Sequence, residues 1–134
     1  LKTERGQAAL QRELARTDVL LTSFRPSALN KLGLSWKALH KAHPTLALVA
    51  IVGAPGDRAE EPGHDLTYLA DADLVTGLDL PPTLFADMGG ALMAADAVLQ
   101  AVLLKRSTGR GSFHEVALSD AAAWLALPRT WGLT

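Results

Sequence analysis

A continuous apolar run at residues 46–52 (LALVAIV) constrains the fold more than any other feature of this chain. A strand that is apolar at every position is expected where both faces of a sheet are covered. A second run, 18–23, has an apolar centre, and helical patterns separate the two runs. Two such strands joined through helices are typical of a parallel sheet. We therefore predict an α/β fold.

The remaining segments continue this alternation of helix and strand. The longest predicted helix spans 86–105 and ends in a basic pair, which suits the negative end of a helix. A polar loop, 53–63, follows the apolar strand, and loops in this position commonly bind ligands in open α/β sheets. The other predicted elements are helices at 5–16, 26–32, 36–40, 64–72 and 121–127, and a strand at 113–118.

Composition excludes several classes of function. The chain has 13 basic and 14 acidic residues, so its charge gives no argument for binding nucleic acid or an anionic membrane. The absence of cysteine excludes disulfides and zinc–thiolate sites. It also suits a reducing compartment, so we expect a cytoplasmic protein. The histidines show no metal-ligand spacing, and no metal site is predicted.

The apolar stretch 91–104 resembles a membrane segment in composition alone. It is shorter than the ~20 residues that a span requires, and Asp96 and Gln100 interrupt it. We therefore expect a buried helix and no membrane partner.

Two short motifs, 62–65 (PGHD) and 86–90 (ADMGG), each place a proton-transfer side chain at the expected start of a helix. The partial positive charge there favours an ionised Asp87 and disfavours protonation of His64. Both side chains are therefore predicted to act as bases near neutral pH. Each also has an ordinary explanation, Asp87 as a helix N-cap and His64 as a polar loop residue.

The glycine pair Gly89-Gly90 is unusual inside a helix, because each glycine costs about 1 kcal/mol relative to alanine. Two explanations stay open: close approach of a ligand to the backbone, or close packing of two helices. The acidic pair at 60–61 is interpreted as solvated charge.

In combination, four segments resemble the class III CoA-transferase family, also called CaiB/BaiF, which includes the α-methylacyl-CoA racemases. The segments occur in the family's order, at residues 17–26 continued by 31–34, at 62–68, at 85–90 and at 105–121. The resemblance implies a Rossmann-like parallel sheet with flanking helices, a separate small domain, and two chains interlocked in a homodimer. Residues 1–134 would be the central part of the large domain, without its first strand and without the small domain. We expect such a fragment to be inactive alone.

The resemblance also implies an acyl-CoA substrate, with CoA as part of the substrate and no permanently bound cofactor. In the family's racemases, a histidine and an aspartate at the positions of His64 and Asp87 flank the α-carbon of the acyl group. One removes the α-proton and the other returns a proton from the opposite face. In the family's transferases the aspartate attacks the thioester and passes CoA to a carboxylic acid. Transferases tend to carry an aromatic residue at the position of His64, so the resemblance favours the racemase branch.

Further roles follow from the same resemblance. Arg25 is expected to bind a phosphate of CoA, because a guanidinium group matches phosphate geometry. Asp65 and Tyr68 are expected to orient His64 or to line the pocket. The backbone N–H at Asp87 is expected to stabilise the enolate oxygen. Further substrate contacts are expected from Met88, Gly89 and Gly90.

The chain departs from the family pattern at two places near these residues. Ser27 stands where the family usually has glycine, and 52–56 replaces a loop that contains an aromatic residue. The altered loop, at 53–56, leaves open a non-catalytic relative that binds CoA or mediates dimerisation. An unrelated flavodoxin-like binding domain, folding as a self-contained monomer, is a third alternative.

Overall fold

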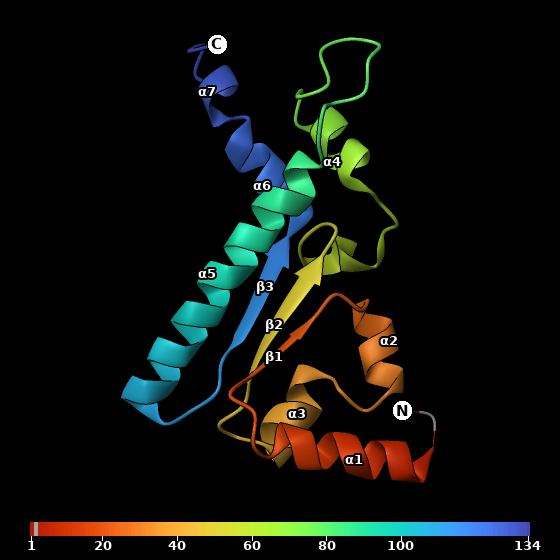
Figure 1. The fold of residues 1–134 in the computed structure, drawn as a ribbon, viewed down its shortest axis with the longest axis vertical. Coiled ribbons are helices and arrows are strands. Elements are labelled where there is room, and N and C mark those ends of the chain that lie inside the picture. Colours follow the sequence, from red (N-terminus) through yellow and green to blue (C-terminus); the bar gives the residue numbers. More distant parts are fainter. Residues whose placement is uncertain (2) are drawn as a thin grey trace.

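The sheet is parallel, as the apolar runs predict. The computed structural model describes Leu1 and residues 3–134 (Figure 1). Its three strands pair in the order β1-β2-β3. They are β1 (Val19–Thr22), β2 (Ala47–Val52) and β3 (Phe113–Ala117). The longest apolar run forms the central strand, and β1 and β3 form the edges.

Consecutive residues of β2 supply two separate cores, which explains why the strand is apolar throughout. Leu48 packs against leucines from the helices on one face of the sheet. Val49 packs against Ala94, Ala97 and Val116 on the other face. Figure 1 shows helices on both sides of the sheet. One face is covered by α1 (Glu4–Leu14), α2 (Pro26–Lys31) and α3 (Trp36–Ala42), and the other by α5 (Phe85–Thr108).

The segments that follow β2 and β3 gather at the carboxyl ends of the strands (Figure 1). They are the 3-10 helix η1 (Gly56–Glu60), α4 (Asp65–Asp71), α6 (Leu118–Leu125) and α7 (Leu127–Thr130). Tyr68, Leu69, Ala86 and Ala122 form one core between α4, α6 and the first turn of α5. This core brings the start of α4 beside the start of α5, although a long connection separates them in the sequence.

The prediction that the longest helix is buried is wrong for one of its faces. Small residues of α5 face the protein interior and are buried: Ala86, Gly90, Ala94, Ala97 and Ala101. Leu92, Leu99 and Leu103 are exposed. Small side chains let the helix backbone approach the strands closely, and the leucines are left on the outside. By length and composition α5 would also pass as a membrane span, which is weak evidence because core helices of soluble proteins meet the same criterion.

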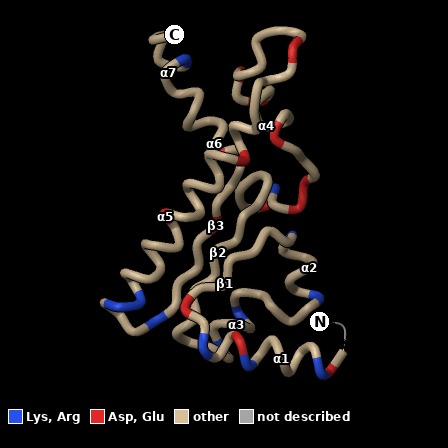
Figure 2. Tube along the Cα trace, viewed as in Figure 1, with Lys and Arg blue, Asp and Glu red and all other residues tan. Residues whose placement is uncertain are grey.

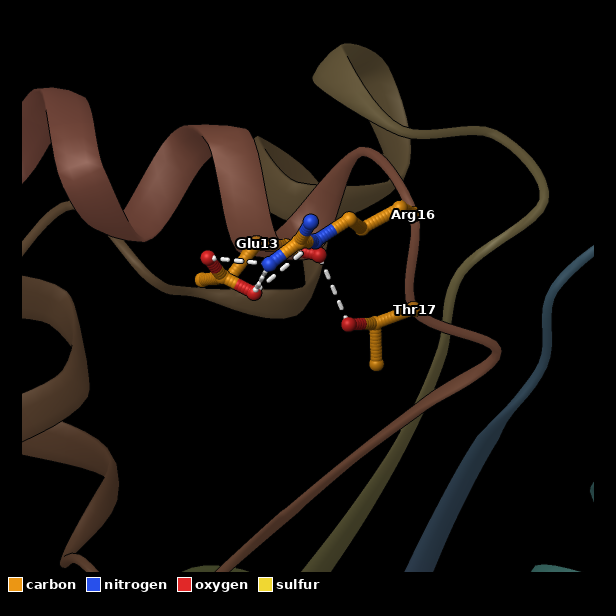
Figure 3. A network of polar contacts seen from close by, with 3 residues as sticks. All are labelled: Glu13, Arg16 and Thr17. Atoms are coloured by element: carbon orange, nitrogen blue, oxygen red, sulfur yellow. Dashed lines mark hydrogen bonds and ion pairs between the residues drawn. The ribbon is translucent and has the colours of Figure 1, made fainter.

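Short-range polar contacts order the segment between α1 and β1 (Figure 3). The Arg16 guanidinium contacts the Glu13 carboxylate at 2.6 Å, and the Thr17 hydroxyl donates to the Glu13 carbonyl oxygen at 2.7 Å. All three side chains are polar and the ion pair is exposed, so this network fixes the local path of the chain and contributes little to stability.

Charge is distributed unevenly over the molecule. Figure 2 shows acidic residues along the segment from η1 to the start of α5, while most Lys and Arg lie toward the opposite end. Residues 56–90 include eight acidic residues and a single basic one, Arg58. An anionic ligand at this end of the sheet therefore needs cations from elsewhere in the chain.

Candidate active site

His64 directly precedes α4 and adopts an extended backbone conformation there. Its backbone N–H donates to the Thr67 hydroxyl at 3.4 Å, and its carbonyl oxygen accepts from the Thr67 N–H at 2.8 Å. These contacts hold the residue in the N-cap position, while its side chain is exposed. The motif at 62–65 therefore presents an imidazole at the start of a helix, as predicted.

Asp87 lies inside the first turn of α5, whose N-cap is Leu84. The interpretation of Asp87 as an N-cap is therefore wrong. Its side chain is exposed at the same end of the sheet as His64. An exposed carboxylate in a first helical turn, with no capping role, is available for chemistry.

A buried carboxylate joins the two motifs. Asp65 is only 6% exposed, and its Oδ1 accepts a hydrogen bond from the backbone N–H of Asp87 at 2.9 Å. Asp65 thus ties the start of α4 to the first turn of α5 and satisfies one of the N–H groups that a helix leaves unpaired there. Because the Asp87 N–H already donates to the Asp65 carboxylate, the expectation that it stabilises an enolate oxygen is corrected.

The electrostatics of Asp87 also differ from the expectation. Partial burial raises the pKa of Asp87, the neighbouring Asp65 carboxylate raises it further, and His64 opposes the shift. The helix terminus favours the ionised form, whereas desolvation and the like charge of Asp65 favour the protonated form. These influences show that His64, Asp65 and Asp87 share one electrostatic environment. A carboxylate with a raised pKa is better matched to proton transfer near neutral pH.

Tyr68 extends from α4 to the end of β2, where its hydroxyl lies between two glycines. A Cβ atom at Gly53 or at Gly63 would overlap this hydroxyl. Burial raises the pKa of Tyr68, Asp87 raises it further, and Arg25 opposes the shift. The Tyr68 hydroxyl is therefore influenced both by the predicted phosphate-binding arginine and by the predicted catalytic carboxylate.

A cavity of about 190 Å³ adjoins this tyrosine at the carboxyl ends of β1 and β2. Arg25, Gly53, Glu61, Gly63 and Tyr68 are among the residues that line it. The structure thus brings together the predicted binding residues Arg25 and Tyr68. His64, Asp87 and Met88 do not line this cavity, and Met88 is 58% exposed.

The glycine pair of α5 is explained by helix packing. A Cβ atom at Gly89 would lie 3.3 Å from the Cβ of Ala121, and one at Gly90 would overlap the side chain of Leu118. Both neighbours belong to α6, so the two glycines allow α5 and α6 to approach closely. The expected contact between these glycines and a thioester stays a prediction.

Sequence analysis missed one polar contact near the cavity. Glu60 was interpreted as solvated charge, but its carboxylate accepts hydrogen bonds from the backbone and the hydroxyl of Ser27. The one signal for this contact in the sequence is Ser27, which stands where the family usually has glycine. In the part of the chain that the structure describes, no cluster of three or more His, Asp and Glu residues is arranged to hold a metal ion.

Comparison with known proteins decides the family. A family model described as CoA-transferase family III matches residues 1–131. The chain belongs to this family. Among curated class III relatives, human α-methylacyl-CoA racemase is 32% identical over 136 residues, which cover 94% of this chain and 36% of the human enzyme.

Other class III relatives point to a different reaction. A probable fatty acyl-CoA transferase of Mycobacterium tuberculosis is also 32% identical, over 93% of this chain and 34% of that protein. Among solved structures, a CaiB/BaiF family protein from Brucella suis superposes with a TM-score of 0.88 at 26% identity, covering 98% of this chain and 37% of that one. The chain spans about a third of the length of the relatives it matches. The chain therefore belongs to a family of enzymes that act on acyl-CoA. Both racemases and CoA-transferases occur among its relatives.

Proposed function

We propose that the protein transfers a proton at the α-carbon of a 2-methylacyl-CoA, with His64 and Asp87 as the two bases. The observation that carries this proposal is the position of an exposed imidazole and an exposed carboxylate in one electrostatic environment at the carboxyl end of the sheet. The link from Asp65 to the Asp87 backbone supports a fixed spacing between them. The racemase among the relatives supports the same reaction.

In this mechanism one of the two bases removes the α-proton, and the electrons pass to the thioester oxygen to form an enolate. The other group, which is in its protonated form, then delivers its proton to the α-carbon, and delivery from the opposite face inverts the centre. The enolate oxygen needs a hydrogen-bond donor. This donor is not the Asp87 N–H, which already donates to the Asp65 carboxylate.

Isotope exchange tests this reaction. The full-length protein is incubated with a 2-methylacyl-CoA in heavy water, and deuterium at the α-carbon is measured by mass spectrometry. We expect uptake in the wild type and its loss in His64→Ala and in Asp87→Asn. Asp96→Asn is the matched control, since Asp96 is an exposed carboxylate on the same helix, and among the described residues its side chain accepts a hydrogen bond only from Gln100. Absence of α-deuterium in the wild-type product would overturn the proposal.

CoA transfer between an acyl-CoA and a carboxylic acid is the second candidate. It is favoured by the exposure of the Asp87 carboxylate and by the CoA-transferases among the relatives. In this reaction the Asp87 carboxylate attacks the thioester carbonyl and CoA leaves as the thiolate, which gives a mixed anhydride. CoA thiolate then attacks the aspartyl carbonyl and the donor carboxylate leaves, which gives an aspartyl-CoA thioester. The acceptor carboxylate attacks this thioester and releases CoA thiolate, which attacks the acyl carbonyl of the acceptor and frees the Asp87 carboxylate. A hydroxylamine-sensitive acyl adduct on Asp87, without α-deuterium uptake, would support transfer; CoA binding without turnover would indicate a non-catalytic relative.

The proposal includes a cytoplasmic homodimer of the full-length protein. The exposed leucines of α5 support an interface, because contiguous exposed apolar side chains mark surfaces that associate. Light scattering on the full-length protein should give twice the mass of one chain, and a monomeric mass at micromolar concentration would count against the dimer.

A further inference from the structure

Two glutamates hold the loop between β2 and α4 in place, one on the sheet and one in the loop itself. Glu115 of β3 accepts a hydrogen bond from the Gly56 N–H at 2.9 Å. Glu60, at the end of η1, accepts from the Ser27 backbone N–H at 2.6 Å and from the Ser27 hydroxyl at 2.9 Å. The loop is therefore fixed to the sheet at one end and to α2 at the other.

The contact between Glu60 and Ser27 replaces a missing helix cap. The N-cap residue of α2 is Arg25, which makes no side-chain capping hydrogen bond. The Ser27 N–H belongs to the first turn of α2, where N–H groups lack partners within the helix. Glu60 supplies the acceptor from a position 33 residues later in the chain.

This contact lies beside the cavity near Tyr68 without forming part of its wall. Arg25 and Glu61 line the cavity, whereas Ser27 and Glu60 do not. Arg25 is two residues before Ser27, and Glu61 directly follows Glu60. The hydrogen bonds between Ser27 and Glu60 therefore connect the two backbone segments that carry Arg25 and Glu61, and they fix the distance between them.

The same contact leaves Arg25 available for an anionic ligand. Both carboxylate oxygens of Glu60 accept hydrogen bonds from Ser27. Of the ion pairs found among the described residues, none involves Arg25, and Glu61 pairs with Arg58 at 2.8 Å. The acidic residues around Arg25 are thus bound to other partners.

We propose that Glu60 is a positioning residue that acts through Ser27 to hold Arg25 in place for a phosphate of CoA. The inference rests on the CoA binding contained in the proposed function, and it assigns a role to a residue that touches neither the substrate nor the reacting atoms. A binding group that is already ordered in the free protein loses less conformational entropy on binding. Removal of the Glu60 carboxylate therefore weakens CoA binding and leaves the chemical step unchanged.

Calorimetric titration of the full-length protein with CoA tests this role. Glu60→Ala should raise the Kd for CoA about 10-fold, with a matching rise in KM and a kcat within about 2-fold of the wild type. Glu60→Gln keeps an acceptor for the Ser27 N–H and should bind CoA nearly as well as the wild type. Asp57→Ala is the matched control, because Asp57 is an exposed acid of the same 3-10 helix and its side chain makes no hydrogen bond or ion pair with another described residue.

A double-mutant cycle tests whether Glu60 acts through Arg25. In an Arg25→Met background, Glu60→Ala should change the Kd for CoA by less than about 2-fold, because the group that Glu60 positions is already gone. Full additivity of the two substitutions would overturn the inference. If Glu60→Ala does not fold, Ser27→Ala provides the second variant, since it removes the hydroxyl contact and keeps the backbone contact; we expect a Kd about 3-fold higher.

The outcomes separate this inference from the proposed reaction. A wild-type protein that binds CoA in a Glu60-dependent way but takes up no α-deuterium would refute the reaction and support the role of Glu60. A Kd that is the same in Glu60→Ala and the wild type would refute the role of Glu60 and leave the reaction untouched. A wild-type protein that binds no CoA would refute both.

Discussion

The buried carboxylate of Asp65 accepts a hydrogen bond from the backbone N–H of Asp87 at 2.9 Å. Asp65 follows His64 directly, so this bond links the two predicted bases through a chain of three residues. It also places a negative charge beside Asp87, which contributes to the raised pKa of that side chain.

Asp65→Asn should separate these two effects. The amide oxygen of asparagine still accepts from the Asp87 N–H, but the negative charge is gone, so the pKa of Asp87 falls. The acidic limb of the pH profile of kcat/KM should therefore move to lower pH in the full-length enzyme. An acidic limb at the wild-type position would show that Asp65 does not set the pKa of Asp87.

Asp65→Ala should destabilise the fold, because it leaves the Asp87 N–H without its acceptor and empties a buried position. We expect a loss of about 1–3 kcal/mol in the free energy of unfolding, measured by chemical denaturation. Asp71→Ala is a suitable control, since Asp71 is an exposed acid at the other end of α4. An equal loss in both variants would argue against the bond to Asp87 as the cause.

The raised pKa of Asp87 predicts how stability depends on pH. The folded chain binds a proton at Asp87 more tightly than the unfolded chain, whose carboxyl has a pKa near 3.8. The contribution of Asp87 to stability is therefore greatest below pH 3.8 and falls as the pH rises toward the folded-state value. Asp87→Asn removes this dependence, so its Tm relative to the wild type should increase across this pH interval. A constant difference in Tm would contradict the shift.

Alanine substitutions at the two glycines around the Tyr68 hydroxyl should respond differently when that hydroxyl is removed. Gly53→Ala and Gly63→Ala should each cost about 1–3 kcal/mol in the free energy of unfolding, since the added methyl group overlaps a buried side chain. Tyr68→Phe should partly restore Gly53→Ala, whose Cβ would still lie 3.2 Å from Cζ of the ring. It should not restore Gly63→Ala, whose Cβ would lie 2.7 Å from the ring carbons. Equal rescue of both variants would contradict this arrangement.

Gly111→Ala should be more harmful than any other glycine substitution discussed above. A Cβ atom there would overlap the backbone carbonyl of Leu46, which cannot rotate away as a side chain can. We expect a cost of about 3 kcal/mol by chemical denaturation. Gly77→Ala is the matched control, because a Cβ built at Gly77 has no heavy atom of a described residue within 4 Å apart from its own chain neighbours. A Gly111→Ala variant as stable as this control would show that the turn before β3 adapts.

The parts of the fold that could be predicted are those set by local sequence pattern. The run at 46–52 is apolar at every position because Leu48 and Val49 serve opposite cores, and this pattern identified a strand covered on both faces. The two motifs likewise lie at helix starts, because glycine and proline before His64 and the apolar run after Asp87 mark those boundaries locally.

Contacts between distant segments could not be predicted in the same way. The bond from Asp65 to Asp87 spans 22 residues, and the one from Ser27 to Glu60 spans 33. Both depend on how distant segments pack, and in the sequence the two acceptors, Asp65 and Glu60, look like ordinary surface charge. The exposed leucines of α5 were missed for a related reason: their hydropathy indicates burial, but the close approach of alanines to the sheet turns them outward.

The order of the strands has a practical consequence for work with this chain in isolation. With β2 in the centre, β1 and β3 each present one row of backbone N–H and C=O groups that no strand among the described residues covers. A strand of another molecule can pair with such an exposed edge through backbone hydrogen bonds. Expressed by itself, this 134-residue chain is therefore prone to aggregate through these two strand edges.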